Sequence, residues 1–235
     1  MAYSIKNFIN TENSKITDKE SCFKISERTF RELCACGTNI KRQVICNLSD
    51  SAIFIRDDII QWTVGETKPT SGSNIIREFL DKTIHSSKNN GYNEKRIEGI
   101  SECSGTGIIT TKFIPDYFTF LDISNWNKVR VSKDAFVACS NTIKIYNDNA
   151  NGSNNNGYYL LEGSKGIVCL RTKFNSSELI KIELNCDTVK CNKDVLNDRN
   201  LVVLYSDTIE KCVGSFGDGS SDVYKGSGIL IMYPC

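Results

Sequence analysis

The sequence predicts a mainly β protein, and three observations support that class. Short runs rich in Ile, Val, Tyr and Phe recur along most of the 235 residues, often alternating with polar residues. Clusters of Gly, Asn, Asp and Ser, which favour turns, separate these runs. Three of the runs follow similar glycine turns, which indicates an internal repeat. We therefore expect an internally repeated β-sandwich, barrel-like or β-prism architecture with one inserted helix.

The expected strands follow one another from residue 52 to residue 233. In 178–184, ELIKIEL, apolar residues alternate with lysine and glutamate, as in a half-buried strand. The asparagine-rich stretch 147–157 is typical of a long hairpin loop. The expected strands are 52–62, 107–113, 117–123, 128–132, 142–146, 158–163, 166–172, 178–184, 200–206 and 228–233.

The inserted helix is expected at 72–85, within the segment SGSNIIREFLDKTI. Its apolar residues recur at helical spacing, and Ser73 or Asn74 can cap its start. We expect the apolar stripe to pack on the protein's own sheet; a partner-binding face is the alternative. A shorter helical turn is expected at 26–33, SERTFREL.

A glycine turn followed by the same kind of strand occurs three times. Gly107, Gly166 and Gly228 each precede two aliphatic residues and follow a small polar turn, GTG, GSKG or GSG. They lie 59 and 62 residues apart. Glycine here is expected to supply permissive backbone at equivalent corners. A dinucleotide or phosphate-binding loop is not expected, because a strand-like run and not a helix follows the glycines.

A second repeated signature contains an aspartate. Residues 129–146 align with 189–205, and residues 47–62 align with 131–146. The aspartates matched in this way are Asp50, Asp134 and Asp194. We interpret the chain as one β-rich domain, 1–235, built of three related units. They span about 40–100 (with the helical insertion), 101–160 and 161–235. Such units, of a shortened double-stranded β-helix type, can close into a pseudo-threefold barrel or prism that satisfies strand edges internally.

The sequence resembles the family named for altered inheritance of mitochondria (member twenty-four), which has many bacterial members. The resemblance lies in 101–123, in 129–145, in LLEGSKGIVCLRT and in VYKGSGILIMYP, and it spans about 45–235. The family's glycine turns often read glycine-proline-glycine, unlike those of this chain. The resemblance implies a fold like that of the tryptophan RNA-binding attenuation protein, repeated within one chain. It implies no catalytic residues and only a poorly characterised function, linked in yeast to mitochondrial inner-membrane organisation.

Composition and charge narrow the partners. The formal net charge is +1, which argues against a dedicated polyanion binder. The first residues, MAYSIKNFIN, lack an apolar run of signal-peptide length, and no stretch approaches the length of a membrane span. We therefore expect a cytoplasmic protein, with peripheral membrane association left open.

Cysteine and histidine provide no recognisable site. Eleven cysteines, several inside apolar strand-like runs such as FVACS around Cys139, are expected to be reduced core thiols. The pairs nearest to zinc spacing are Cys34 with Cys36 and Cys186 with Cys191, and neither is specific. His85, the single histidine, is expected to be a solvated loop residue. No catalytic, cofactor-binding or metal-binding residue is assigned, and no cofactor is expected.

Three classes of function remain. The favoured one is a non-enzymatic scaffold or interaction protein with protein partners or self-association. Nucleic-acid binding, which is less favoured, would use 88–96 or 125–133, where basic and aromatic residues alternate. An enzyme or small-molecule binder would need carboxylates to converge. The adjacent pair Asp57 and Asp58 would point to opposite faces of a strand. The aligned aspartates Asp50, Asp134 and Asp194 are expected to cap their own turns; convergence on one axis is the alternative.

Overall fold

The computed structural model confirms a mainly β protein. It describes residues 12–18, 23–34, 37–70, 97–124, 126–147, 157–192, 201–216 and 219–234. The expected helix at 72–85 lies outside these residues. The helical turn expected at 26–33 is wrong, because this segment lies within β2 (Phe23–Cys34), which pairs with β3 (Gly37–Arg56) over its whole length. A long antiparallel neighbour overrides a local helical preference.

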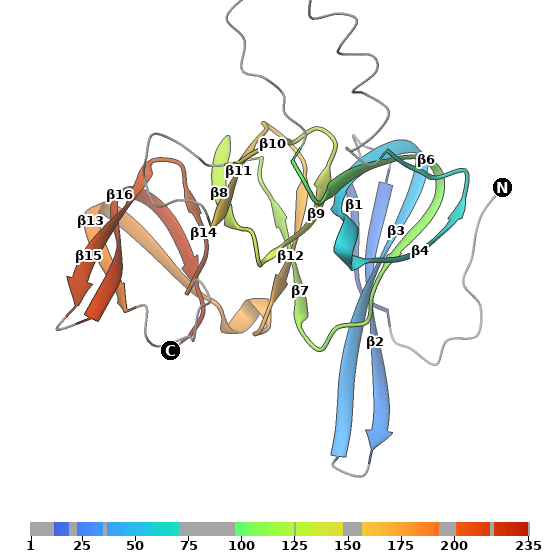
Figure 1. Cartoon of the computed structure of the whole chain (residues 1–235), viewed down its shortest axis with the longest axis horizontal. Helices are drawn as coiled ribbons and strands as arrows, with labels where there is room; N and C mark the ends of the chain where they lie inside the picture. Colours follow the sequence, from blue (N-terminus) through green and yellow to red (C-terminus); the bar gives the residue numbers. More distant parts are fainter. Residues whose placement is uncertain are drawn as a thin grey trace, which may run out of the picture.

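Two antiparallel sheets contain the described strands (Figure 1). The first sheet consists of β1 (Glu12–Asp18), β2, β3, β4 (Ile60–Gly65), β5 (Lys68–Thr70), β6 (Ile100–Thr111), β7 (Tyr117–Asp122), β9 (Phe136–Ser140) and β12 (Ile167–Thr172). The second consists of β8 (Lys128–Ser132), β10 (Lys144–Asn147), β11 (Tyr158–Glu162), β13 (Ile180–Asn192), β14 (Val202–Ser206), β15 (Ile209–Phe216) and β16 (Gly219–Met232). Single 3-10 turns occur at Asp57–Ile59 and Ser176–Glu178.

The strands follow the chain along the long axis of the molecule. β1 to β6 lie at one end, β7 to β12 in the middle, and β13 to β16 at the other end (Figure 1). β3 has β6 along one edge, while β2 and then β9 share its other edge. β8 lies between β11 and β14. The two end regions are therefore joined to the middle region by strand pairing, β3 with β9 and β8 with β14.

Two hydrophobic clusters fill the interior, and each joins an end region to the middle. One contains Ile53 and Ile109 from the first end together with Val137 and Cys169 from the middle. The other joins Val131, Tyr158 and Leu161 of the middle to the last region, including its residues Tyr205, Tyr224 and Leu230. Burial of these aliphatic and aromatic side chains is the main stabilising contribution to the joined sheets.

The expected strand 52–62 is divided by the 3-10 turn at Asp57–Ile59. Its first part is the end of β3, and its last part is the start of β4. The strand-like run FVACS forms β9, whereas β1, β2, β5 and β15 were not expected. The pseudo-threefold prism and the boundaries of the three units stay predictions at this point.

Candidate functional site

Three turns between consecutive strands lie against glycine-containing segments, and we call these places the first, middle and last corners. In the first corner the β4–β5 turn faces residues 105–107, and in the middle corner the β9–β10 turn faces 163–166. In the last corner the β14–β15 turn faces 226–228. All three predicted glycines, Gly107, Gly166 and Gly228, belong to these corners.

The corner turns approach Gly107, Gly166 and Gly228 too closely for a side chain at these positions. A Cβ added to Gly107 would lie 2.1 Å from the Val64 carbonyl oxygen. At Gly228 it would lie 2.7 Å from the Ser206 Cβ. Such separations are far below van der Waals contact, so the expectation that glycine permits this backbone arrangement is correct.

Hydrogen bonds at the middle and last corners follow the same pattern. The Ser140 hydroxyl accepts from Ile167 N (2.8 Å) and donates to Ile167 O (3.3 Å). The Ser206 hydroxyl accepts from Ile229 N (2.8 Å) and donates to Ile229 O (3.3 Å). At the first corner the same position on the strand is Val64, which pairs with Ile108. One serine at each of the other two corners therefore ties the start of the turn to the residue after the facing glycine, in β12 or β16.

The strand before each corner has the same irregularity. Pairing shifts between Ile60 and Trp62 in β4 and between Val202 and Leu204 in β14. In β9 it shifts in the same way between Phe136 and Ala138. The residue just before β4, β9 or β14 accepts one backbone hydrogen bond from the end of the strand that it pairs with, which is β6, β12 or β16. These acceptors are the carbonyls of Ile59, Ala135 and Leu201, which bond to Lys112 N, Arg171 N and Tyr233 N at 2.7, 2.6 and 3.0 Å.

The aligned aspartates do not occupy matching places. Asp50 lies in a bulge of β3 with φ of 50°, and its N–H donates to Thr106 Oγ1 at 3.0 Å. Cys186 occupies the corresponding bulge of β13, with φ of 58° and its N–H on Ser227 Oγ at 2.9 Å. Asp134 lies instead in the β8–β9 turn, where its carbonyl accepts from Arg171. The match between Asp50 and Asp134 is therefore wrong, and Asp194 lies outside the described residues.

Neither carboxylate shows the capping bond that the sequence suggested. Within the described part of the chain, Asp50 and Asp134 engage neighbours through backbone atoms, and no backbone N–H donates to either carboxylate. The positive φ of Asp50 is one that aspartate tolerates better than most residues. A carboxylate at this position is explained by backbone conformation, without a ligand.

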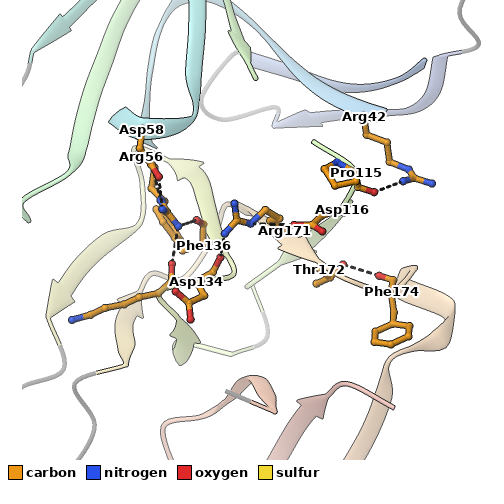
Figure 2. A network of polar contacts seen from close by, with 11 residues as sticks. Arg42, Arg56, Asp58, Pro115, Asp116, Asp134, Phe136, Arg171, Thr172 and Phe174 are labelled. Atoms are coloured by element: carbon orange, nitrogen blue, oxygen red, sulfur yellow. Dashed lines mark hydrogen bonds and ion pairs between the residues drawn. The ribbon is translucent and has the colours of Figure 1, made fainter. Parts of the chain in front are cut away.

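Two arginines hold the β8–β9 turn, and one of them, Arg56, links the first region to the middle region (Figure 2). Arg56 pairs with Asp58 at 2.6 Å and donates to the Lys133 carbonyl at 3.1 Å. Arg171 donates to the Asp134 carbonyl at 3.1 Å, and its Nε lies 3.5 Å from an Asp116 oxygen. Figure 2 shows both guanidinium groups converging on the backbone around Asp134. These donors are used to hold the β8–β9 turn in place.

The adjacent carboxylates Asp57 and Asp58 lie on the 3-10 turn and not on a strand, so the strand placement expected for them is wrong. The hydrogen bond from Arg56 lowers the pKa of Asp58, which stays ionised. Since Asp58 is engaged by an arginine of its own strand region, it is committed to a structural ion pair.

A buried polar cluster lies in the second sheet. Lys211 pairs with Asp222 at 3.0 Å, and their side chains are only 7% and 12% exposed. The Lys211 ammonium also lies 4.9 Å from the centre of the Tyr158 ring. The Tyr158 and Tyr224 hydroxyls are 3.0 Å apart, and burial raises both phenol pKa values well above their ordinary range. The tyrosines therefore stay protonated and serve as packing and hydrogen-bonding groups.

The cysteines with placed side chains form no disulfide: Cys46, Cys103, Cys139, Cys169, Cys186, Cys191 and Cys212. Burial raises the pKa of Cys46 to about 12 and that of Cys103 to about 11, so both are poor nucleophiles at neutral pH. Cys186 is exposed whereas Cys191 is buried, so this pair does not form the zinc site considered from spacing. Cys36 and His85 lie outside the described residues. Within the described ranges, no group of three or more His, Cys, Asp or Glu is placed to hold a metal ion.

The two basic segments have different outcomes. Residues 88–96 lie outside the described part of the chain. In 125–133, Lys128 pairs with Glu162 at 3.4 Å and Arg130 with Asp207 at 2.6 Å. The Lys133 ammonium lies 5.3 Å from the Tyr159 ring centre. The basic side chains of this segment are thus directed to partners in the same molecule.

β4 is more exposed than β9 and β14, the other strands that lead into a corner. The second half of β13 is likewise more exposed than the end of β3 and β8, which hold the same place in the other two regions. β4 is largely exposed, and Val64 is 41% exposed, whereas β9 and β14 are almost wholly buried. Residues 187–190 of β13 are likewise mostly exposed, while β8 is largely buried. Among the described strands, β4 pairs only with β6, and β13 only with β16. These two strand edges are the candidate functional surface, and sequence patterns did not reveal them.

The comparisons with known proteins give a fold and no family. No family model matches the chain, and a search of curated proteins found no significant match. The crystal structure of protein SPYM3_0169 from Streptococcus pyogenes is similar, with a TM-score of 0.53 and 14% sequence identity. The similarity covers 89% of this chain and 94% of that one. It supports the all-β architecture over nearly the whole chain. Among the described residues, no helix is long and apolar enough to cross a bilayer.

Proposed function

We propose that this chain is a non-enzymatic scaffold or interaction protein that binds protein partners through exposed strand edges. The observation that carries the proposal is the exposure of β4 and of 187–190 in β13. Unpaired strand edges present N–H and C=O groups that another chain can pair with. Exposed Val64, beside half-buried Trp62, adds apolar surface that a partner would cover.

The organisation into three related units is part of the proposal. Its support is the repetition of contacts: three glycine-faced corners, three strands with the same irregularity, and matching serine bonds at two corners. The contacts favour a succession of units along one axis, in which each unit adds strands to the next. The proposed relation to the altered-inheritance-of-mitochondria family, with an attenuation-protein-like fold, rests on the same glycine turns and adjoining strands.

The ionisable groups also favour a structural role. Arg56, Arg171 and Lys211 are engaged by carboxylates or carbonyls of this chain, and each engagement joins neighbouring strands or turns. Acid–base catalysis would need a group held near neutral pKa beside a cavity. Small-molecule or nucleic-acid binding is the alternative, and a cytoplasmic location is proposed with the main function.

The test is affinity purification with the full chain as bait. The wild-type chain is compared with Val64→Lys, which places a charge on the exposed edge, and with Val213→Lys on β15. Val213 is also an exposed edge valine, 50% exposed, so it is a matched control. We expect partners that bind wild type and Val213→Lys and are lost with Val64→Lys. Retention of the same proteins by all three baits would contradict an edge-binding scaffold.

A further inference from the structure

Two strand edges of this chain, on β4 and on the second half of β13, have no neighbour among the described strands and are complementary to each other. We infer that copies associate head to tail, with β4 of one copy added beside residues 188–191 of β13 in the next copy. The inference rests on the proposed function, because it names the partner of the same edges as a second copy of this chain.

The molecule contains this interaction twice already. β9 pairs with the second half of β3, where Ser140 lies opposite Ile53 and Ala138 opposite Ile55. β14 pairs with β8, where Ser206 lies opposite Val129 and Leu204 opposite Val131. In each case a strand that leads into a corner, β9 or β14, pairs with a strand of the preceding region, the end of β3 or β8. We call such a pairing between two regions a joint. The two joints have the same register, because Ser140 and Ser206, which hold the same place before their corners, lie opposite the corresponding residues Ile53 and Val129.

The two free edges are the unused halves of that joint. β4 leads into the first corner as β9 and β14 lead into theirs, but its second edge has no described neighbour. The second half of β13 follows the bulge at Cys186 as the end of β3 follows the bulge at Asp50. Its edge opposite β16 likewise has no described neighbour. Figure 1 places β4 and β13 at opposite ends of the long axis, so the two edges do not meet within one chain.

The internal joints predict the register. Val189 pairs with Tyr224 of β16, as Ile53 pairs with Cys103 of β6 and Val129 with Leu161 of β11. Val64 holds the place of Ser140 and Ser206 before its corner. Val189 of one copy should therefore lie opposite Val64 of the next copy. Lys190 then lies opposite Thr63, and Cys191 opposite Trp62.

The backbone donors of β4 are oriented for this pairing. Glu66 N donates to Thr106 O at 3.0 Å, on the β6 side. Since alternate amides of a strand point to opposite edges, the N–H groups of Thr63 and Gly65 point to the free side. At the β8–β14 joint, Asp207 N donates to Lys128 O at 3.4 Å. The matching bond between copies runs from Gly65 N to Thr188 O.

A charge pair completes the internal template. Arg130 reaches across the β8–β14 joint to the Asp207 carboxylate at 2.6 Å. Lys190 occupies the place of Arg130 on β13, and exposed Glu66 lies one residue beyond the place of Asp207. Lys190 of one copy and Glu66 of the next therefore bring opposite charges to the same end of the joint. Because the two surfaces differ, the contact is heterologous and propagates into a ring or a filament.

The test measures association of the purified full chain by light scattering after size exclusion, from about 1 to about 500 μM. Wild type and Val213→Lys should form concentration-dependent oligomers, while Val64→Lys should associate more weakly by about tenfold or more. Circular dichroism confirms that each variant is folded. Wild type that remains monomeric throughout this range overturns the inference, and so does equal association of all three proteins.

A cross-link fixes the register. A photo-cross-linking amino acid substituted for Lys190 should join two copies at peptides that contain Thr63, and a copy carrying Val64→Lys should give several-fold less product. Cross-links to any other strand overturn the inference. Monomeric behaviour with edge-dependent capture of other proteins would leave the proposed scaffold function standing, whereas loss of both would remove the two proposals together.

Discussion

β4 and β14 have the same contacts on one side and opposite surroundings on the other. Each shifts register at the same point, leads into a turn that faces two glycines, and is preceded by a carbonyl that accepts a bond from its partner strand. β14 also pairs with β8 and is almost wholly buried, while β4 has no second described neighbour and is largely exposed. The conformation of such a strand is therefore set by its corner and one partner, and the second partner supplies burial.

The side chains follow this difference. β14 contributes Val, Leu and Tyr to the larger hydrophobic cluster, whereas β4 carries Gln61 and Thr63 on its exposed positions. Trp62 and Val64 are the apolar side chains that a second neighbour would bury. The comparison predicts that changes at the shared corner contacts lower the stability of both ends alike, while changes at the second edge of β4 affect only association.

The largest effect is expected at the corner glycines. Gly105 (φ 120°) and Gly226 (φ 134°) would each place a new Cβ within 2.5 Å of a carbonyl oxygen, that of Glu66 or Thr208. Gly105→Ala and Gly226→Ala should each lower the free energy of unfolding by about 3 kcal/mol or more, since the clash adds to the backbone strain. Urea titration measures the loss.

Gly99→Ala is the control for conformation alone. Gly99 also has a positive φ, 80°, but nothing lies within 4 Å of its added Cβ. Its cost should be about 1 kcal/mol. Equal costs for all three substitutions would show that close approach at the corners contributes nothing, and a large cost at only one corner would break the comparison between the two ends.

The next effect distinguishes the last region from the middle one. In the last region Lys211 of β15 lies opposite Tyr224 of β16. At the corresponding place in the middle region, Ile145 of β10 lies opposite Leu161 of β11. Lys211→Met should destabilise the protein by about 3 kcal/mol, because it leaves Asp222 buried without its ion-pair partner. Adding Asp222→Leu should restore most of this loss in thermal unfolding. A double variant as unstable as the single one would contradict the role of the buried charge.

A smaller effect is expected at the joint between the middle and last regions. Arg130→Ala removes a partly buried ion pair with Asp207 and a hydrogen bond to the Asp207 carbonyl. It should cost about 1.5 kcal/mol in chemical denaturation. Lys181→Ala removes an exposed pair with Glu183 and should cost clearly less than Arg130→Ala, because solvent screens this pair. Similar costs for the two variants would mean that this joint gains nothing from its charges.

The smallest effect is a pH dependence at the joint between the first and middle regions. Arg56 lowers the pKa of Asp58 from its ordinary value of 3.8. The stabilisation is therefore present above this value and is lost as the pH falls through the lowered pKa. Acid titration of stability should show a shallower decline below pH 4 for Asp58→Asn than for wild type. Identical acid profiles would rule out a stabilising pair.

The sequence predicted the β class and the glycine corners for physical reasons that hold locally. Alternating apolar residues and glycine turns reflect one strand and its nearest neighbours, so 166–172 and 228–233 were placed close to β12 and the end of β16. FVACS, read as an apolar strand-like run, forms β9; because it is buried on both sides it shows no alternation, so its face in the sheet could not be assigned from the sequence. β15 was missed because its glycine and polar residues resemble a turn.

The alignment of aspartates failed because contacts, and not residue identities, recur. The β3 bulge holds Asp50 where the β13 bulge holds Cys186, and both donate an N–H to a hydroxyl across the sheet. A short aspartate match in loops of unequal length cannot detect this equivalence. The exposed edges could not be predicted either, since exposure depends on which strands meet in three dimensions.

The most direct test of the central claim is amide hydrogen exchange at β4, β9 and β14 as protein concentration is varied. The account predicts that Thr63 and Gly65 exchange rapidly in dilute protein and become protected as concentration rises. Cys139 and Tyr205, whose strands have both neighbours, should stay protected throughout. Strong protection of Thr63 and Gly65 in the most dilute sample, or exchange there that does not change with concentration, would contradict it.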